Sequence, residues 1–465
     1  MLAYGITYGM NRILSKLAAY KFLLAVFALS FLAHITLFNF PDQAVFDEIY
    51  FGTFVRSYTT NSHFFDIHPP LGKLLIAGTA KLGGINLPAD LTVIGQQYDS
   101  TALFFLRFFP LLAGIFLPVV AALIALELTK SKTAALLTGL MIVFENALLT
   151  QSRFIFLDIP MLFFGTAALF VFLRQEYTTP TATRTKYILL VVSGLLLGAS
   201  FCTKWTALAI LFPFGLIALY SFWQTKSFKW FATKIIVVFA ASLFVYIASF
   251  AAHFALLTKP GPGDAFFETA FLEKPFFEKF LSLNKEMYAA NKRITDDHPY
   301  KSSWYAWPLD QKPIFYWNSS ASEEHTQQIW LLGNPIVWFA SLLSLIGGIV
   351  LLFAKVFTKK PRDISALLLF LLLIGWITSY APFALINRPL FLYHYFFPLL
   401  FSILLASYII SWLIKKLIPS RYQFTAVLLF SGIIALSFLL ISPMTYGLVF
   451  APDGWYAQTI LKLFL

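Results

Sequence analysis

Long uncharged apolar runs constrain this chain more than any other feature of its sequence. Eleven such runs approach or exceed the roughly 20 residues that a helix needs to cross about 30 Å of hydrocarbon. They cover residues 20–40, 102–127, 132–149, 154–174, 187–203, 206–223, 232–256, 331–354, 364–385, 389–414 and 422–447. The strands of a membrane β-barrel alternate apolar and polar residues, whereas these runs do not. The sequence therefore predicts an all-α polytopic membrane protein with about 11 transmembrane helices.

The charged residues are few, and their distribution predicts an orientation. Only 12% of the residues are charged, against about 25% in soluble domains. The net charge is +12, and 18 of the 34 basic residues lie at the N-terminus and in alternate short connections. These are Arg12, Lys16 and Lys21; Lys130 and Lys132; Arg174, Arg184 and Lys186; Lys226, Lys229 and Lys234; Lys355, Lys359, Lys360 and Arg362; and Lys415, Lys416 and Arg421. Because short cytoplasmic loops collect Lys and Arg, we expect a cytoplasmic N-terminus and no nucleic-acid partner.

Two long polar segments then fall on the outer side of the membrane, residues 41–101 and 257–330. The first apolar run resembles a signal peptide but lacks a small-x-small cleavage site, so we expect it to be a retained helix. Cys202 is the single cysteine, which excludes an internal disulfide and a cysteine metal cluster. Any chemistry is expected in the two outer segments.

Asp47 and Glu48 form an acidic pair directly after the first run. Adjacent residues on a helix point about 100° apart, so the pair is not the facing carboxylate pair of a glycosidase. One of the two can act alone as a general base. The other interpretation is a solvated acidic step at a helix start, which the helix dipole favours.

The stretch FFDIHPPLGK at residues 64–73 is the second polar motif. Two prolines before an amphipathic run predict the first turn of a helix lying in the membrane interface. His68 and Lys73 would flank that N-terminus, where free N–H groups and cations make a phosphate site. The motif is not a P-loop, because Ile67 stands where a glycine is required five residues before Gly72. Alternatively, Lys73 snorkels from an interfacial helix.

Several charged residues lie within or at the ends of the apolar runs: Arg107, Glu145, Arg153, Asp158, Lys204, Arg388 and His394. Such groups are costly in lipid and usually face a cavity or a partner. Most lie toward the outer ends of their helices in the predicted topology. This distribution favours an enzyme acting on a lipid-borne substrate over a transporter, whose site tends to lie near the midplane. Snorkelling or structural pairing is the alternative for each.

Metal-binding signals are weak. The sequence has no H-E-x-x-H and no Asp-x-Asp, the usual divalent-ion ligand for a nucleotide sugar. Asp296, Asp297 and His298 can ligate a cation, but an acidic turn capped by a histidine is the favoured interpretation. We therefore expect no metal, no other cofactor and no nucleotide-sugar donor.

Seven stretches resemble the protein O-mannosyltransferases, polytopic GT-C glycosyltransferases that take mannose from a polyprenyl (dolichyl) phosphate. They are Asp47-Glu48, FFDIHPPLGK at 64–73, Arg107, ENALLTQSRFIFLD at 145–158, Lys204-Trp205, HPYKSSWYAWPL at 298–309 and FLYHYFFPLL at 391–400. They span nearly the whole chain in the family's order. The resemblance implies one GT-C transmembrane domain over residues 1–465, with the acidic pair and interfacial helix of residues 41–101 at an extracytoplasmic active site and residues 257–330 as a second outer loop.

The resemblance also implies roles for individual residues. Asp47 is the expected base, Glu48 would position sugar or acceptor, and Arg107 matches a functionally important arginine. The expected ligands of the carrier phosphate are His68, Lys73, Arg107, Arg153 and Arg388. Acceptor or loop support is expected from Asp66, Asp158, His298 and Trp304. Residues 257–330 are too few for the MIR domains of eukaryotic members, which suggests a bacterial or archaeal member in a prokaryotic plasma membrane.

The expected activity is inverting transfer of mannose from a polyprenyl-phosphate carrier to Ser/Thr hydroxyls of an acceptor polypeptide. A sugar phosphate is already a good leaving group, so one base and cationic stabilisation suffice. The nearer alternative is a related transferase with another sugar or with a lipid or glycan acceptor. The farther alternative is a transporter or lipid flippase. The sequence does not predict an oligomeric state.

Overall fold

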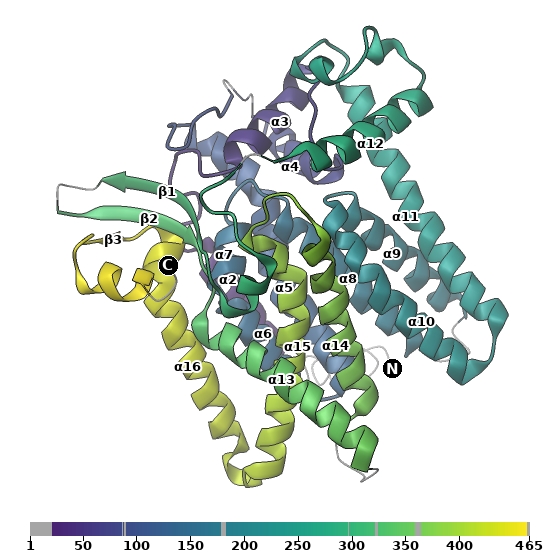
Figure 1. Cartoon of the computed structure of the whole chain (residues 1–465), viewed down its shortest axis with the longest axis vertical. Helices are drawn as coiled ribbons and strands as arrows, with labels where there is room; N and C mark the ends of the chain where they lie inside the picture. Colours follow the sequence, from purple (N-terminus) through teal and green to yellow (C-terminus); the bar gives the residue numbers. More distant parts are fainter. Residues whose placement is uncertain are drawn as a thin grey trace, which may run out of the picture.

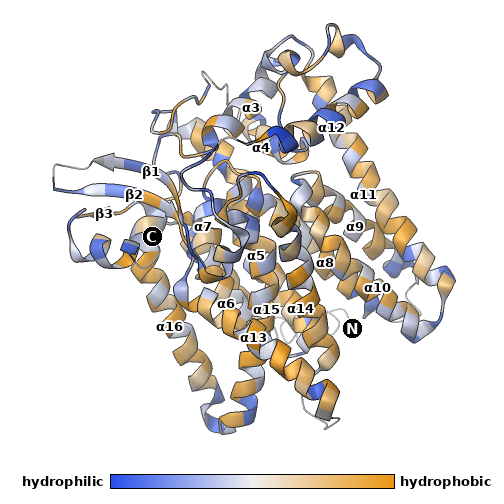
Figure 2. Cartoon of the chain, viewed as in Figure 1, coloured by the Kyte–Doolittle hydropathy of each residue, from blue (hydrophilic) through white to orange (hydrophobic). Residues whose placement is uncertain are grey.

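The computed structural model describes residues 21–85, 87, 90–177, 183–295, 297–320, 324–358 and 364–462. Figure 1 shows a bundle of long helices with a layer of short helices and a three-stranded sheet at one end. The bundle helices are hydrophobic over most of their length, and the end layer is more polar (Figure 2). The expectations for Arg12, Lys16, Asp296, Lys359, Lys360 and Arg362 lie outside the described residues.

Twelve helices of the described residues form the bundle. They are α2 (Lys21–Ile35), α5 (Ser100–Thr129), α6 (Lys132–Val143), α7 (Asn146–Ser152), α8 (Asp158–Glu176), α9 (Thr183–Phe201), α10 (Leu211–Thr225), α11 (Phe228–Leu256), α13 (Pro335–Thr358), α14 (Ala366–Tyr380), α15 (Phe396–Leu417) and α16 (Ser420–Tyr446). The end layer, here called the cap, contains α3 (Glu48–Thr60), α4 (Leu71–Leu82), α12 (Phe276–Arg293), β1 (Ile314–Ser320), β2 (Thr326–Leu331) and β3 (Val449–Phe450).

The polytopic prediction is confirmed, with one change in the helices. Among the described residues, nine helices are long and apolar enough to cross a membrane, counting the 3-10 turns that lead into α10 and α15 and follow α14. The pair α6 and α7 makes a tenth span if it is counted as one, and it is bent by 59°. α2 has only 15 described residues. Each of the 11 predicted runs therefore contains helix, but the run at 132–149 is broken rather than straight.

Side chains satisfy the backbone groups that the break between α6 and α7 frees. The carboxylate of Glu145 accepts hydrogen bonds from the N–H of Leu148 at 2.6 Å and of Asn334 at 3.0 Å. The side-chain amide of Asn334 donates to the carbonyl of Phe144 at 2.7 Å. A break at membrane depth is tolerated only when its polar groups are paired inside the protein. Glu145 is thus a structural residue of the bundle.

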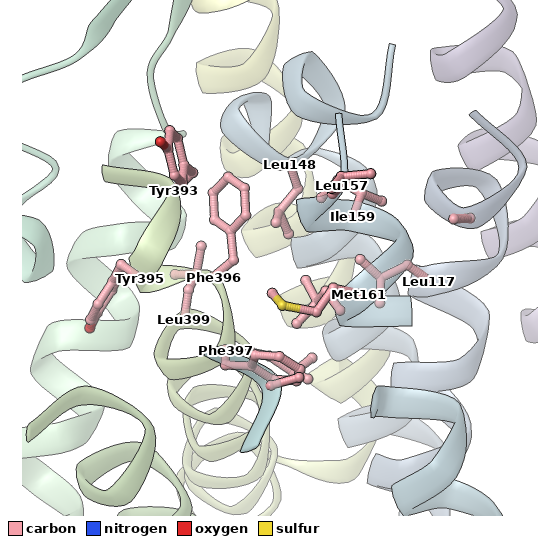
Figure 3. Close-up of a cluster of buried hydrophobic side chains, with 14 of the residues drawn as sticks. Leu117, Leu148, Leu157, Ile159, Met161, Tyr393, Tyr395, Phe396, Phe397 and Leu399 are labelled. Carbon is pink, nitrogen blue, oxygen red and sulfur yellow. The ribbon is translucent and has the colours of Figure 1, made fainter. Parts of the chain in front are cut away.

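The centre of the bundle lies where α5, α7, α8 and α15 meet (Figure 3). Ile159 of α8 and Leu399 of α15 have no exposed surface, and Phe396 is only 1% exposed. Close packing of this kind fixes the relative positions of helices. It holds the cap-side end of α8, where Asp158 lies, and the 3-10 turn before α15, which carries Tyr393.

The two long polar segments pack on each other within the cap. The N–H of His63 donates to the carbonyl of Lys259 at 2.9 Å, and the N–H of Lys259 donates to the carbonyl of Asn61 at 2.9 Å. The side chain of Asn291 on α12 donates to the carbonyl of Ile67 at 3.1 Å. In Figure 1 the connections between α10 and α11 and between α15 and α16 lie at the opposite end. Both polar segments therefore lie at one end of the bundle.

The cap contains a small antiparallel sheet, in the order β1-β2-β3, which the sequence did not predict. Phe315 pairs with Trp330 and Trp317 pairs with Ile329, so Tyr316 is an extra, bulged residue. Bulges commonly redirect a side chain. Here the bulge places the ring of Tyr316 on that of Phe46, with the centroids 4.6 Å apart.

Helix α4 begins at Leu71, where the two prolines predict a helix start. Gly72 permits a close approach to the bundle, because an added Cβ would lie 2.8 Å from the side chains of Leu157 and Thr203. The N-terminus of α4 is therefore fixed against the starts of α8 and of the turn that follows α9.

Candidate active site

Asp47 lies at the N-terminus of α3 and is half-buried. Its carboxylate caps no N–H group and has no hydrogen-bond or ion-pair partner among the described residues. Burial raises the pKa of Asp47 to about 7; the charge of Lys204 opposes this change, and the charges of Asp158 and Asp66 add to it. An aspartate in water titrates near 4. Asp47 is therefore a stronger base than an ordinary aspartate.

Glu48, the other member of the acidic pair, has no exposed surface and is fully engaged. Oε1 accepts hydrogen bonds from Arg107 Nε at 2.8 Å and from the N–H of Ile155 at 2.9 Å. Oε2 accepts from Arg107 Nη2 at 2.7 Å and from the N–H of Val45 at 2.9 Å. Glu48 thus joins the loop before α3 to α5 and to the turn between α7 and α8.

Arg107 is likewise fully engaged and has no exposed surface. Besides its two bonds to Glu48, it donates to the carbonyls of Asn39 at 3.1 Å, Pro41 at 2.7 Å and Gln43 at 2.8 Å. A guanidinium has five N–H donors, and all five are used. The arginine predicted to hold a phosphate is placed under the loop that carries Asp47, with no donor left for a ligand.

A second polar network lies beside Asp47 at the cap end of the bundle. Lys204 donates to Asp158 Oδ1 at 2.8 Å, and Gln151 donates to Asp158 Oδ2 at 2.9 Å. The hydroxyl of Tyr316 donates to the side-chain oxygen of Gln151. Lys204 Nζ also lies 4.9 Å from the centroid of the Tyr393 ring. This network brings together α7, α8, β1 and the turns before α10 and α15.

Lys73 points into the protein rather than snorkelling to the surface. It is 1% exposed, and its ammonium donates to the carboxylate of Asp66 and to the carbonyls of His68 at 2.9 Å and Pro69 at 3.1 Å. Burial lowers the pKa of Lys73, while Asp66 acts to raise it. All three ammonium donors are used. Lys73 and Asp66 therefore hold the loop before α4 in shape.

His68 is placed among cations. Burial, together with the charges of Lys204, Lys73 and Arg388, holds the pKa of His68 well below its usual value of 6.5. Its ring lies against Phe51, with the centroids 6.3 Å apart. The imidazole is therefore neutral near pH 7 and can donate one hydrogen bond.

Residues 24–258 match the family described as dolichyl-phosphate-mannose-protein mannosyltransferase. Residues 276–463 match the C-terminal four-transmembrane region of protein-O-mannosyltransferase. The chain belongs to the protein O-mannosyltransferase family. The resemblance drawn from the motifs is thus confirmed at the level of the family.

Mannosyltransferases from yeasts are among the curated relatives. The chain is 32% identical over 241 residues to dolichyl-phosphate-mannose--protein mannosyltransferase 1 of Candida albicans. This match covers 50% of this chain and 27% of the relative. It is 34% identical over 256 residues to the enzyme of the same name from Saccharomyces cerevisiae. That match covers 53% of this chain and 30% of the relative. The chain thus matches less than a third of the length of either relative.

Solved structures support the GT-C fold. The S. cerevisiae protein O-mannosyltransferase Pmt1-Pmt2 complex bound to the sugar donor contains a chain with a TM-score of 0.83 and 19% identity. That match covers 92% of this chain and 90% of the other. An oligosaccharyltransferase of Archaeoglobus fulgidus matches with a TM-score of 0.56 and 14% identity, over 95% of this chain and 57% of the other. At these identities the likeness concerns the fold alone.

Two further cations of this mannosyltransferase-family chain differ in their surroundings. Arg153 is 1% exposed and donates to the carbonyls of Thr36 and Leu37, each at 2.6 Å, at the end of α2. Its guanidinium also lies 4.6 Å from the centroid of the Tyr446 ring. Arg388, by contrast, is half-buried between α14 and α15 and has no hydrogen-bond or ion-pair partner among the described residues. Arg388 and His68 are thus predicted phosphate ligands with donors available, whereas the one donor atom of Arg153 without a partner, Nε, is buried.

His298 and Trp304 come from the second polar segment. The ring of His298 contacts those of Phe46 and Phe391, with centroids 6.2 and 5.0 Å away, so it lies next to the residue that precedes Asp47. The carbonyl of Trp304 accepts a hydrogen bond from the hydroxyl of Tyr380 at 2.9 Å. Within the part of the chain that the structure describes, no three His, Cys, Asp or Glu side chains are grouped as metal ligands.

Sequence reasoning missed three members of the site: Gln151, Tyr316 and Tyr393. Gln151 and Tyr393 lie inside two of the stretches that resemble the family, and a polar Gln in the short gap between two apolar runs was a signal that could have been used. Tyr316 gave no such signal, because only the bulge in β1 directs it to the bundle.

Proposed function

We propose that this family member transfers mannose from a polyprenyl-phosphate carrier to Ser/Thr hydroxyls of proteins, with inversion of the anomeric centre. The observation that carries the proposal is Asp47: a half-buried carboxylate with no protein partner in the described residues and a pKa raised to about 7. The names of the curated relatives, which specify dolichyl-phosphate mannose and protein acceptors, support the choice of substrates.

Asp47 acts as the general base. It takes the proton of the acceptor hydroxyl while the hydroxyl oxygen bonds to C1 from the face opposite the phosphate. The bond between C1 and the phosphate oxygen breaks, and the polyprenyl phosphate leaves with that electron pair. A base is most effective when its pKa lies near the working pH, and the raised pKa of Asp47 meets this condition.

The leaving phosphate needs cationic stabilisation, and the free donors of Arg388 can provide it. Lys204 lies near the same site, although Asp158 occupies one of its donors. We assign Lys73 and Arg107 to holding the loops, because all of their donors bind protein groups. We assign Arg153 to holding the end of α2, because its two Nη atoms donate to the carbonyls of Thr36 and Leu37, although its buried Nε has no partner among the described residues. Glu48 then positions the loop of Asp47 rather than the sugar.

An apolar pocket supports a lipid carrier. It has a volume of about 430 Å³, and side chains of α8, α9, α10 and α11 and of the turn before α10 line it. Trp205, which follows Lys204 in the chain, lies on its wall. A pocket of this kind can take part of an isoprenoid chain whose phosphate lies near Lys204.

The cap is proposed to face outward from a prokaryotic plasma membrane, with the N-terminus in the cytoplasm. The basic short connections support this orientation, since the loops between α10 and α11 and between α15 and α16 lie at the end opposite the cap. Between α11 and α13 the described residues contain one helix, short 3-10 turns and the hairpin of β1 and β2. The described part of this loop thus holds no separate folded domain, which supports the prokaryotic assignment.

Product analysis tests the proposal. The purified protein in liposomes would be given labelled polyprenyl-phosphate mannose with a Thr-containing peptide, a lipid acceptor or a glycan acceptor. We expect label on the peptide hydroxyl as an α-linkage when the donor is β-linked. Transfer only to the lipid or the glycan, or only from another sugar phosphate, would replace the proposal with the nearer alternative. Carrier movement across the bilayer without any transfer would indicate a flippase.

A further inference from the structure

A polar pocket in the cap adjoins the candidate active site and shares Arg388 with it. Its volume is about 580 Å³, and it is lined by Thr295, Asp297, residues 301–306, Gln311, Lys312 and residues 386–390 of the connection between α14 and α15. This volume lies within the roughly 300 to 1,000 Å³ of ordinary ligand pockets. The side chains of Ser303, Gln311 and Asn387 lie on its walls, whereas the pocket beside α11 is apolar. The two pockets therefore suit chemically different substrates.

The polar pocket carries an excess of positive charge. Lys301, Lys312, Arg388 and Asp297 line it, which makes three cations and one carboxylate. Lys301 pairs with Asp297 at 2.5 Å. Lys312 and Arg388 have no carboxylate partner in the described parts of the chain. Because Arg388 is assigned to the carrier phosphate, Lys312 is left in this pocket for an acidic residue of a second ligand.

Fixed backbone forms the wall of this pocket. The N–H of Ser302 donates to the carbonyl of Leu390 at 2.8 Å, which ties the two lining segments together. The indole of buried Trp307 donates to the hydroxyl of Ser302 at 2.8 Å. Tyr305, 66% exposed, stands at the edge of the pocket as an aromatic surface. A pocket built in this way is formed before any ligand arrives, which lowers the entropic cost of binding.

The pocket also adjoins the candidate active site. Arg388 lines the pocket, and its charge acts on the imidazole of His68. His298 follows the lining residue Asp297, and its ring contacts Phe46, the residue before Asp47. The pocket therefore lies next to residues that flank the proposed base.

We infer that this pocket binds the acceptor polypeptide beside its Ser or Thr, and that Lys312 gives it a preference for an acidic flanking residue. The inference rests on the proposed function and specifies its acceptor. A polypeptide suits the hydroxyl, amide and cationic lining, because an extended backbone needs hydrogen-bonding partners. The lipid carrier suits the apolar pocket.

Matched peptides test this inference. Each peptide would contain one Thr and a single Asp, Asn or Lys. The position of that residue would be varied from four residues before the Thr to four residues after it. At low salt we expect the KM for the best Asp peptide to be about 3- to 10-fold below that of its Lys counterpart, with kcat unchanged, as for partly exposed charge pairs. Raising the salt concentration should reduce the difference.

Lys312→Glu should make the KM for the Lys peptide lower than the KM for the Asp peptide, and it should leave the KM for the donor unchanged. Lys285→Glu is the matched control, because Lys285 is an exposed lysine of α12 outside the pocket. This control should keep the KM for the Asp peptide below the KM for the Lys peptide, as in the wild type.

Peptide binding by fluorescence anisotropy, without donor, separates this inference from the proposed function. Charge-dependent binding that Lys312→Glu reverses would support the pocket even if no mannose were transferred. Equal binding of Asp and Lys peptides, or a Lys312→Glu effect on the donor KM alone, would overturn the inference while leaving mannose transfer intact.

Discussion

Two neighbouring regions at the cap end of the molecule differ in how their charged groups are paired. In one, which we call the anchor, Glu48 and Arg107 are buried and bind each other and nearby backbone groups with every donor of the arginine. In the other, the open site, Asp47 and Arg388 are half-buried and have no partner among the described residues. Adjacent residues 47 and 48 thus belong to different environments.

This difference separates residues that hold the loop in place from residues that act on the substrate. A buried charge whose hydrogen bonds are complete stabilises the loop but has nothing to offer a substrate. An unpartnered, desolvated charge costs stability, and such groups cluster at functional sites. We therefore assign the anchor to positioning the loop and the open site to the reaction. The following substitutions and conditions test that assignment.

Asp47→Asn should produce the largest change. Turnover should fall about 10²- to 10⁴-fold, since the amide cannot accept the proton. Single-turnover transfer with saturating donor measures this loss, and a separate carrier-binding assay should show little change. Asp42→Asn is the control, because Asp42 is an exposed carboxylate of the same loop. Transfer within a few-fold of wild type would move the base to another residue.

The same variant should not be less stable than the wild type. The pKa of Asp47 is raised in the folded protein, so the folded state holds a proton between about pH 4 and pH 7 that the unfolded state has lost. The contribution of Asp47 to the free energy of unfolding therefore falls as the pH rises through that window. At pH 8 the melting temperature of Asp47→Asn should equal or exceed that of the wild type.

Arg107→Ala should act on stability instead. Removing one partner of a buried pair leaves an uncompensated charge on Glu48 and costs about 3–5 kcal/mol. Thermal unfolding in detergent measures the loss. Arg56→Ala is the control, because its 3.1 Å pair with Asp90 is partly exposed and should cost no more than about 1 kcal/mol. Wild-type stability with lost carrier binding would instead make Arg107 a phosphate ligand.

Arg388→Gln should weaken use of the donor. A charged hydrogen bond to the carrier phosphate is worth about 1.5–3 kcal/mol, so the KM for the carrier should rise roughly 10- to 100-fold. The melting temperature should stay near that of the wild type, because Arg388 has no partner to lose in the described structure. Lys285→Gln on α12 serves as the surface control. An unchanged donor KM would remove Arg388 from the open site.

The pH profile should show a smaller effect. The unprotonated form of Asp47 is the base, and its pKa is about 7. The single-turnover rate at low donor should therefore rise about tenfold from pH 6 to pH 8 and then level off. Asp47→Asn should lose this dependence. A wild-type rate that is flat over this range would contradict a titrating base at position 47.

Chelation should have the smallest effect. We expect incubation with EDTA to leave most of the transfer activity, because the donor carries its own phosphate leaving group and the proposed stabilisation comes from Arg388. Activity would be measured before and after chelation and after readdition of Mg²⁺ or Mn²⁺. Complete loss that a metal restores would mean that the acidic residues bind an ion.

Much of the framework was predictable from local patterns. The apolar runs predicted the helices, two prolines predicted the start of α4 at Leu71, and motif spacing predicted the family. The roles of the cations were harder to predict. Lys73 and Arg107 were expected to face a phosphate, yet their donors are used by the carbonyls of His68 and Pro41 and by other protein groups.

The sequence alone determined that this chain is a bundle of membrane helices with a polar cap, because hydropathy is a property of consecutive residues. Only the tertiary structure decided which charges remain available. Arg107 meets Glu48 from 59 residues away, and Tyr316 meets Gln151 from 165 residues away. Whether a charged group is satisfied depends on such distant partners and on burial, and neither can be read from neighbours in the chain.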